Sequence, residues 1–192
     1  SGSIRADAAI VCPGDDLLGL YPDRIAAYGL TRCKLHMMRL RPERAATLGT
    51  AVMSDLGLAR YLGYAELPEA VPLKDRLDRE MRDHRDNGIH LIVVQSEDGS
   101  LVVGDSHHYG PTPDPFIDKG VNDLILSEME AILDLGPYDI SETWIGTYAS
   151  ASDRWRLTDA PDDATRIVMV TAGCGASTAF AIGEETIADL YA

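Results

Sequence analysis

The residues of this chain that could do chemistry begin with a glycine turn, Gly173-Cys174-Gly175, which follows a β-rich run and precedes a helical pattern. Two glycines let the backbone approach a ligand closely, and the free N–H groups at a helix start favour an oxygen that carries negative charge. Ser177 and Thr178 could add hydroxyl donors. The alternative is a tight strand-to-helix turn in which the glycines serve packing alone, because no third glycine completes a GxGxxG dinucleotide motif.

Cys174 lies within that turn, where a helix N-terminus could activate a thiol. With His107 or His108 it could form a thiol–imidazole pair, although the sequence places no base beside it. The alternative is a small residue packed in a turn. Cys12, Cys33 and Cys174 form no CxxC pair, which argues against a disulfide framework or structural zinc site and predicts a reducing, cytoplasmic location.

A second group of candidates lies on a predicted strand, Thr31–Leu40. Arg32, Lys34 and His36 alternate along it and therefore share one face. Three cationic groups in a row could hold a carboxylate or a phosphonate. The alternative is an edge strand whose basic residues prevent aggregation.

The third group is Asp105-Ser106-His107-His108-Tyr109, at the end of a predicted strand. Two adjacent histidines on an extended chain point to opposite sides and do not both face one ion, so we expect no metal site. The remaining interpretations are a histidine or tyrosine that reaches into a ligand pocket, and a solvated loop.

The elements that must position these residues indicate an α+β fold with a mixed, largely antiparallel sheet. We expect a buried strand at Ala8–Cys12, and a hairpin whose strands, Ile89–Ser96 and Leu101–Ser106, flank an Asp-Gly turn. Residues 107–118 form a proline-rich loop. Helical turns are predicted within 54–67, and helices over 73–86 and 121–133. Strands are predicted at Ser141–Ser150 and at Ile167–Ala172. After the glycine turn, a helix is predicted to run to Tyr191. The residues that share one face of this helix are Ala176, Ala179, Phe180, Gly183, Ile187 and Leu190.

Composition narrows the function classes. The 192 residues include 17 Lys and Arg against 31 Asp and Glu, a net charge of −14, which argues against nucleic-acid and anionic-membrane surfaces. The apolar runs are too short for a membrane span. Residues 1–60 carry 8 basic and 6 acidic residues. That segment is therefore the better place for an anion site.

Three segments resemble, in order, motifs of FAD-dependent oxidoreductases of the D-amino-acid oxidase and glycine oxidase family. Residues 6–14, ADAAIVCPG, are similar to a late strand and glycine turn of that family. Residues 144–148, WIGTY, resemble its Trp-x-Gly-x-Arg segment. Residues 170–177, VTAGCGAS, resemble its C-terminal flavin turn.

The resemblance implies that the chain is the C-terminal part of such an enzyme, with the N-terminal GxGxxG half of the FAD-binding domain missing. Residues 1–30 and 151–192 would belong to the FAD-binding domain, and residues 31–150 to the substrate domain. FAD would be the cofactor of the intact enzyme, although this fragment could lack it. It would contact Gly14 and the turn and helix start made by Gly173, Cys174, Gly175, Ala176 and Ser177. The missing half and a second copy of the chain are the expected protein partners.

One departure from the family is informative. The arginine that grips a substrate carboxylate is replaced by Tyr148, which carries no charge. The sequence most resembles a subgroup associated with aminophosphonate breakdown. The resemblance therefore implies oxidation of the C–N bond of a small anionic amine by hydride transfer to the flavin, with no protein acid or base required. The candidate substrate-binding residues are Lys34, His36, His107, His108, Tyr109 and Tyr148. The alternative functions are a non-catalytic, acidic ligand- or protein-binding module, and a thiol enzyme built on Cys174.

Overall fold

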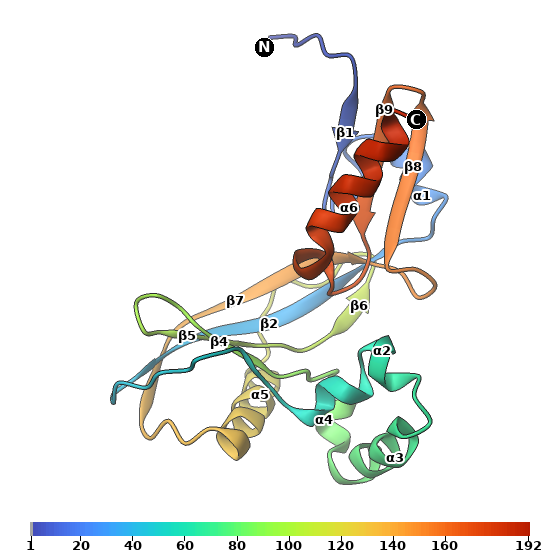
Figure 1. Ribbon diagram of the computed structural model, residues 1–192. Helices are drawn as coiled ribbons and strands as arrows, with labels where there is room; N and C mark the ends of the chain where they lie inside the picture. The colour runs from blue at the N-terminus through green and yellow to red at the C-terminus, as the bar shows by residue number, and fades with distance from the viewer. Residues whose placement is uncertain (1) are drawn as a thin grey trace. The chain divides into compact units, whose positions relative to one another are not determined.

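The computed structural model describes residues 2–192 and divides them into two compact units (Figure 1). Unit 1 contains residues up to 33, 109–112 and 147–192, and unit 2 contains residues 34–108 and 113–146. The fold is α+β, as the sequence predicted. The assignment of the units to a flavin domain and a substrate domain stays a prediction.

Unit 1 is built on a three-stranded sheet in the order β1-β9-β8. β1 pairs with β9 in parallel, and β9 pairs with β8 antiparallel. Figure 1 shows α6 lying along this sheet. The elements of this unit are β1 (Ala9–Val11), α1 (Pro22–Ala26), β8 (Arg156–Asp162), β9 (Thr165–Val170) and α6 (Gly175–Leu190).

The central strand β9 has both of its faces covered. Ile167 and Met169 join Ile25 of α1 in one apolar cluster. Arg166, which precedes Ile167, donates to the Asp189 carboxylate of α6 at 2.5 Å. Alternate residues of β9 therefore meet α1 and α6, as the two-residue period of a strand requires.

Unit 2 holds most of a larger sheet with the order β3-β4-β5-β2-β6, in which β7 also pairs with β2. Its elements are β3 (Val52–Met53), the 3₁₀ helix η1 (Asp55–Ala59), α2 (Leu62–Ala65), α3 (Ala70–Glu80), α4 (Arg82–Asp86), β4 (Ile92–Gln95), β5 (Leu101–Gly104) and α5 (Lys119–Ile132). Three strands contribute residues to both units: β2 (Thr31–Pro42), β6 (His108–Gly110) and β7 (Tyr138–Ser150).

The core of unit 2 lies between this sheet and α5. Met38, Leu40 and Val103 of the sheet and Ile125 and Met129 of α5 belong to one buried cluster. The helix supplies one face because its apolar residues recur at intervals of three and four. The hairpin β4–β5 has the predicted turn, with Gly99 at φ 80°.

Three sequence expectations were wrong. The Ala8–Cys12 strand is not buried: Ile10 is 41% exposed, and in the described chain β1 pairs along one edge only. The face predicted for the last helix from its apolar residues is not the most buried one: Phe180, which lies on it, is 95% exposed, whereas Ile182 and Thr186, which were not placed on it, are buried. The helix predicted over 73–86 is interrupted at Met81, between α3 and α4.

Candidate functional site

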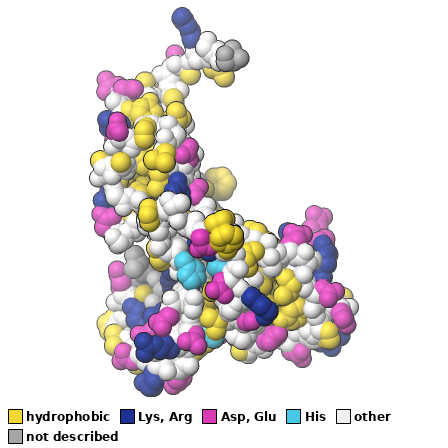
Figure 2. All heavy atoms as spheres, turned by 180° about the vertical axis from the view of Figure 1, so that it is seen from behind, with side chains coloured by type: hydrophobic (Ala, Val, Ile, Leu, Met, Phe, Trp, Pro, Cys, Tyr) yellow, Lys and Arg dark blue, Asp and Glu magenta, His cyan; other side chains and the backbone are white. Residues whose placement is uncertain are grey.

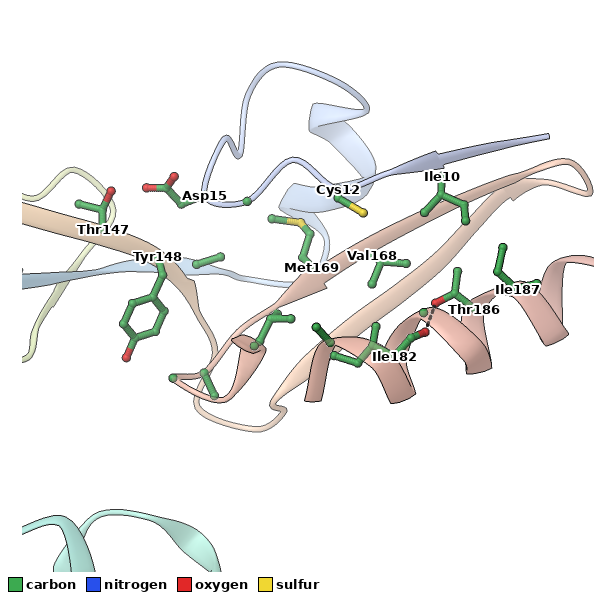
Figure 3. A pocket seen from close by; sticks show the side chains of 18 residues that line it. Ile10, Cys12, Asp15, Thr147, Tyr148, Val168, Met169, Ile182, Thr186 and Ile187 are labelled. Carbon is green, nitrogen blue, oxygen red and sulfur yellow. Dashed lines mark hydrogen bonds between the residues drawn. The ribbon is translucent and has the colours of Figure 1, made fainter. Parts of the chain in front are cut away.

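Unit 1 contains an apolar groove of about 740 Å³ beside α6 (Figure 3). Its walls come from Ile10 of β1 and Cys12 just after it, Val168 and Val170 of β9, and Ile182 of α6. Predicted cofactor residues Gly14, Gly173 and Gly175 also line it. Residues 10–14 therefore meet residues 168–187 at one cavity, although the two segments are far apart in the sequence.

The glycine turn leaves backbone donors at the start of α6. Cys174 is the N-cap residue, and the Thr178 N–H makes the first helical bond, to the Cys174 carbonyl at 3.2 Å. The N–H groups of Gly175, Ala176 and Ser177 precede that bond and have no acceptor within the helix. A ligand oxygen carrying negative charge would find donors and a favourable helix dipole there.

The two hydroxyls of this turn are engaged with the backbone. Ser177 Oγ donates to the Cys174 carbonyl at 3.0 Å, and Thr178 Oγ1 donates to the same oxygen at 2.8 Å. Each hydroxyl has a single hydrogen to donate. In this conformation the turn therefore offers a ligand its N–H groups, not the hydroxyl hydrogens expected from the sequence.

Glycine is required by backbone conformation at Gly14, which has φ 65°. At Gly173 the φ angle is ordinary, and an added Cβ would meet no atom within 4 Å. The absence of a side chain at Gly173 therefore keeps space open at the groove without being needed for the fold.

Tyr148 and Thr147 leave β7 on opposite sides, as Figure 3 shows, and both line the groove. Tyr148 is thus in the unit that carries the glycine turn. Tyr109 also belongs to unit 1 and is 55% exposed on β6. Their roles toward a substrate stay predictions.

Cys174 is partly buried in unit 1. The five histidines of the sequence are at positions 36, 84, 90, 107 and 108, and every one of them belongs to unit 2. The thiol therefore has no imidazole partner within its own unit.

Unit 2 contains a polar pocket of about 510 Å³ that brings together Lys34, His36 and His108. Figure 2 shows histidine side chains at the surface of this unit, beside acidic and apolar side chains. The other polar residues that line the pocket are Asn87, Asp114, Asp118 and Lys119. Arg32, the third cation of the strand, belongs to unit 1 and donates to the carbonyls of Asp15 and Pro111.

His36 is held as a neutral imidazole. Its Nε2 accepts the Asp118 N–H at 3.0 Å, so Nδ1 carries the proton and donates to Ser106 Oγ at 2.8 Å. Burial lowers the pKa of His36, and the positive charge of Lys34 lowers it further. His36 therefore fixes the start of α5 against β2 and is not the cation that the sequence suggested.

Lys34 supplies the positive charge of the pocket. Its side chain is 7% exposed, and Nζ donates to Asp114 Oδ1 at 3.0 Å and to the Phe116 carbonyl at 2.8 Å. The hydrogen bond from Lys34 lowers the pKa of the Asp114 carboxyl.

His108 completes this side of the pocket. Its ring lies edge-on to His36, with 5.6 Å between the ring centroids. Burial lowers the pKa of His108, followed by the effect of Lys34. Its Nε2 is buried and has no hydrogen-bond partner among the described residues. An unsatisfied buried nitrogen is costly, which makes it the polar atom of this pocket best suited to receive a ligand.

His107 points away from this pocket, as expected for two neighbouring residues on an extended chain. Its Nδ1 donates to the Gly88 carbonyl at 2.8 Å, and its ring lies 6.2 Å from that of His90. Burial lowers the pKa of His107 to about 4, although the Asp105 carboxylate, 3.9 Å from Nε2, acts in the opposite direction. The effect of burial prevails, since that distance is too long for a hydrogen bond.

The sequence did not predict Asp114 and Asp118 in the polar pocket, or Ile182 in the groove. Asp118 carried a recognisable signal, because an aspartate before a helical run is a common N-cap, and its carboxylate accepts the Gly120 N–H at 2.7 Å. Asp114 and Ile182 carried no comparable local pattern.

Among residues 2–192, which the structure describes, no group of three or more His, Cys, Asp or Glu side chains could hold a metal ion. Within the same range, no helix has the length and apolar character needed to cross a membrane.

No family model matches this sequence, and no curated protein matches it. Solved structures do match its fold. Glycine oxidase from Geobacillus kaustophilus superposes with a TM-score of 0.54 at 15% identity, covering 82% of this chain and 35% of the oxidase. L-proline dehydrogenase from P. horikoshii gives a TM-score of 0.57 at 18% identity, covering 84% of this chain and 37% of the dehydrogenase.

The chain shares its fold with part of these two enzymes. It spans little more than a third of the length of each. At this level of identity the likeness establishes the fold, and activity has to be argued from the sites.

Proposed function

We propose that this chain is the substrate-domain part, with a piece of the cofactor domain, of an FAD-dependent oxidoreductase that oxidises the C–N bond of a small amine. An amino acid or an aminophosphonate is the expected substrate class. The observation that carries the proposal is the apolar groove of unit 1, where Gly14, Gly173 and Gly175 meet the start of α6. The fold shared with a glycine oxidase and a proline dehydrogenase supports it.

The residues present fit one end of a flavin. An isoalloxazine ring is flat and largely apolar, and its pyrimidine oxygen gains negative charge when the ring accepts a hydride. The side chains of Ile10, Val168 and Ile182 suit the ring, and the N–H groups of Gly175 and Ala176 suit the oxygen. FAD would supply the hydride acceptor. The protein would orient the amine and keep water from the groove.

Lys34 and His108 of unit 2 are the residues that we propose for binding an anionic group. Lys34 is a buried cation, and His108 carries the unsatisfied nitrogen. The replacement of the family arginine by Tyr148 is consistent with a cation supplied from another element. A cytoplasmic location and a homodimer remain parts of the proposal.

A non-catalytic binding module is the second candidate, and the polar pocket favours it, because every residue lining that pocket belongs to unit 2. Under this alternative, ligands would bind unit 2 whether or not flavin is present.

The test uses the full-length product of the gene that encodes this chain. We expect the purified protein to show flavin absorbance, or to acquire it when FAD is added, and to release ammonia from a small amine. Gly173→Leu is expected to lower flavin content, because the new side chain would enter the open space at the groove. Gly49→Leu is the matched control, since Gly49 is equally open but lies in unit 2. Protein that takes up no flavin with FAD in excess would overturn the proposal.

A further inference from the structure

The buried ammonium group of Lys34 forms an ion pair with a carboxylate from an exposed loop. Asp114, whose carboxylate accepts from Nζ at 3.0 Å, has a side chain that is 62% exposed. The Phe116 carbonyl from the same loop is the other acceptor described above. One side of this ion pair therefore lies in the interior of unit 2 and the other lies in solvent.

The loop from Pro113 to Ile117 has little apolar packing of its own. Phe116 is 74% exposed and Ile117 is 40% exposed. Exposed apolar side chains contribute little stabilisation, because the hydrophobic effect scales with the area removed from water. The Asp114 carboxylate accepts from Lys34 Nζ and from the Phe116 N–H of its own loop, so its link to the rest of unit 2 runs through the lysine.

The pocket beside this ion pair is lined by a histidine whose hydrogen-bonding capacity is not satisfied. Its volume is about 510 Å³, and His108, which lines it, has a buried Nε2 that finds no hydrogen-bond partner among the described residues. In the Nε2–H tautomer, His108 would donate to an oxygen placed between its ring and Lys34. An oxyanion has several acceptor oxygens and could serve both groups.

The charges of the pocket oppose such an anion while Asp114 stays in place. Lys34 and Lys119 are offset by Asp114 and Asp118, and Lys119 is itself paired with Asp123 at 2.6 Å. The carboxylate of Asp118 caps α5 and is needed there. Asp114 is therefore the negative charge that a ligand could displace at least cost to the fold.

We propose that the pocket of Lys34 and His108 is an oxyanion site in which Asp114 acts as an internal competitor. An incoming carboxylate or phosphonate group takes the place of the Asp114 carboxylate on Lys34, accepts a hydrogen bond from His108, and releases the loop 113–117. The inference rests on the proposed function only in expecting a small anionic ligand in unit 2, and it needs no flavin.

The test measures the affinity of the full chain for methylphosphonate, with acetate as a second arm, by titration of backbone amide signals. Asp114→Asn keeps the side-chain shape and removes the competing charge, so we expect methylphosphonate to bind about tenfold more tightly. Asp123→Asn is the matched control: it removes the same charge from a carboxylate paired with Lys119, and should change affinity by less than about twofold. The acetate arm distinguishes a carboxylate site from a phosphonate site.

Release of the loop gives an independent readout. Methylphosphonate should increase proteolytic cleavage within 113–117 in the unsubstituted chain. Lys34→Met should abolish binding, with thermal unfolding measured alongside to establish that the variant is folded. Equal tightening by Asp114→Asn and Asp123→Asn, or no tightening by Asp114→Asn, would overturn the inference even if Lys34→Met fails to fold. Flavin content is measured separately, so failure here leaves the flavin proposal intact, and the reverse also holds.

Discussion

Acid should destabilise this protein through His107, and substituting that residue should remove much of the effect. The ring is 7% exposed, and burial lowers its pKa to about 4 from an ordinary value of 6.5. The unfolded chain therefore binds a proton at His107 more readily than the folded chain does. Stability from the neutral ring is present above the unfolded pKa and is lost as the pH falls from about 6.5 toward 4.

The size of this effect follows from the two pKa values. Proton linkage predicts that the free energy of unfolding falls by about 2 kcal/mol between about pH 8 and pH 5 from His107 alone, and by about 3 kcal/mol below pH 4. His36 and His108 also have lowered pKa values and shift the stability in the same direction.

The assay is urea unfolding at the two pH values, for the unsubstituted chain and for His107→Gln. Glutamine is similar in size to histidine and does not titrate. The contributions of His36 and His108 cancel when the two proteins are compared, so the variant should lose about 2 kcal/mol less on acidification. His84→Gln, which alters a histidine bonded to the Ser127 hydroxyl, is the control.

Two results would refute the reasoning. One is an equal loss of stability on acidification in the unsubstituted chain and in His107→Gln. The other is an NMR titration of the His107 ring with its midpoint above pH 6, which would mean that the Asp105 carboxylate outweighs burial.

Three further predictions concern stability and are checked by urea unfolding at neutral pH. Gly14→Ala should cost about 1 kcal/mol or more because its φ is positive, whereas Gly173→Ala should cost little; an equal cost would contradict the reading of the two φ angles. Ile182→Ala should lower the free energy of unfolding by about 2–4 kcal/mol, and Phe180→Ser by less than about 0.5 kcal/mol, because Ile182 is 7% and Phe180 is 95% exposed. A larger loss in Phe180→Ser than in Ile182→Ala would mean that α6 packs through its other face. Asp118→Ala should cost about 1 kcal/mol through loss of the α5 N-cap, and Asp118→Ser should recover most of it.

The sequence predicted those helices and strands in which the apolar residues recur with one clear helical or strand period. The hairpin β4–β5 and the helix α5 were expected where they occur, because turn chemistry and helical spacing agree there. β8 was not expected, since Arg156–Asp162 contains a proline and three charged residues and lacks a clean alternation. For α6, the predicted face included Ala179, Gly183 and Ile187, which line the groove, but it left out Ile182, which lines the groove as well.

The candidate sites were predictable in part. The alternation of β2 put Lys34 and His36 on one face, and the same rule separated His107 from His108. The partners of these residues could not be predicted, because Asp114 meets Lys34 across 80 positions of sequence and Asp118 meets His36 across 82. Such pairings depend on the tertiary arrangement of β2 and α5, on which local spacing carries no information.

The parallel pairing of β1 with β9 has a consequence for the order in which the chain becomes structured. Ala9 lies opposite Thr165, so this ladder closes a loop of about 156 residues, at a chain-entropy cost of about 4–5 kcal/mol. The β4–β5 hairpin closes over a dozen residues or fewer. During synthesis β9 also leaves the ribosome after every residue of unit 2. We therefore expect unit 2 to fold first and the groove of unit 1 to form last, so a nascent chain can hold a formed polar pocket before its glycine turn has been made.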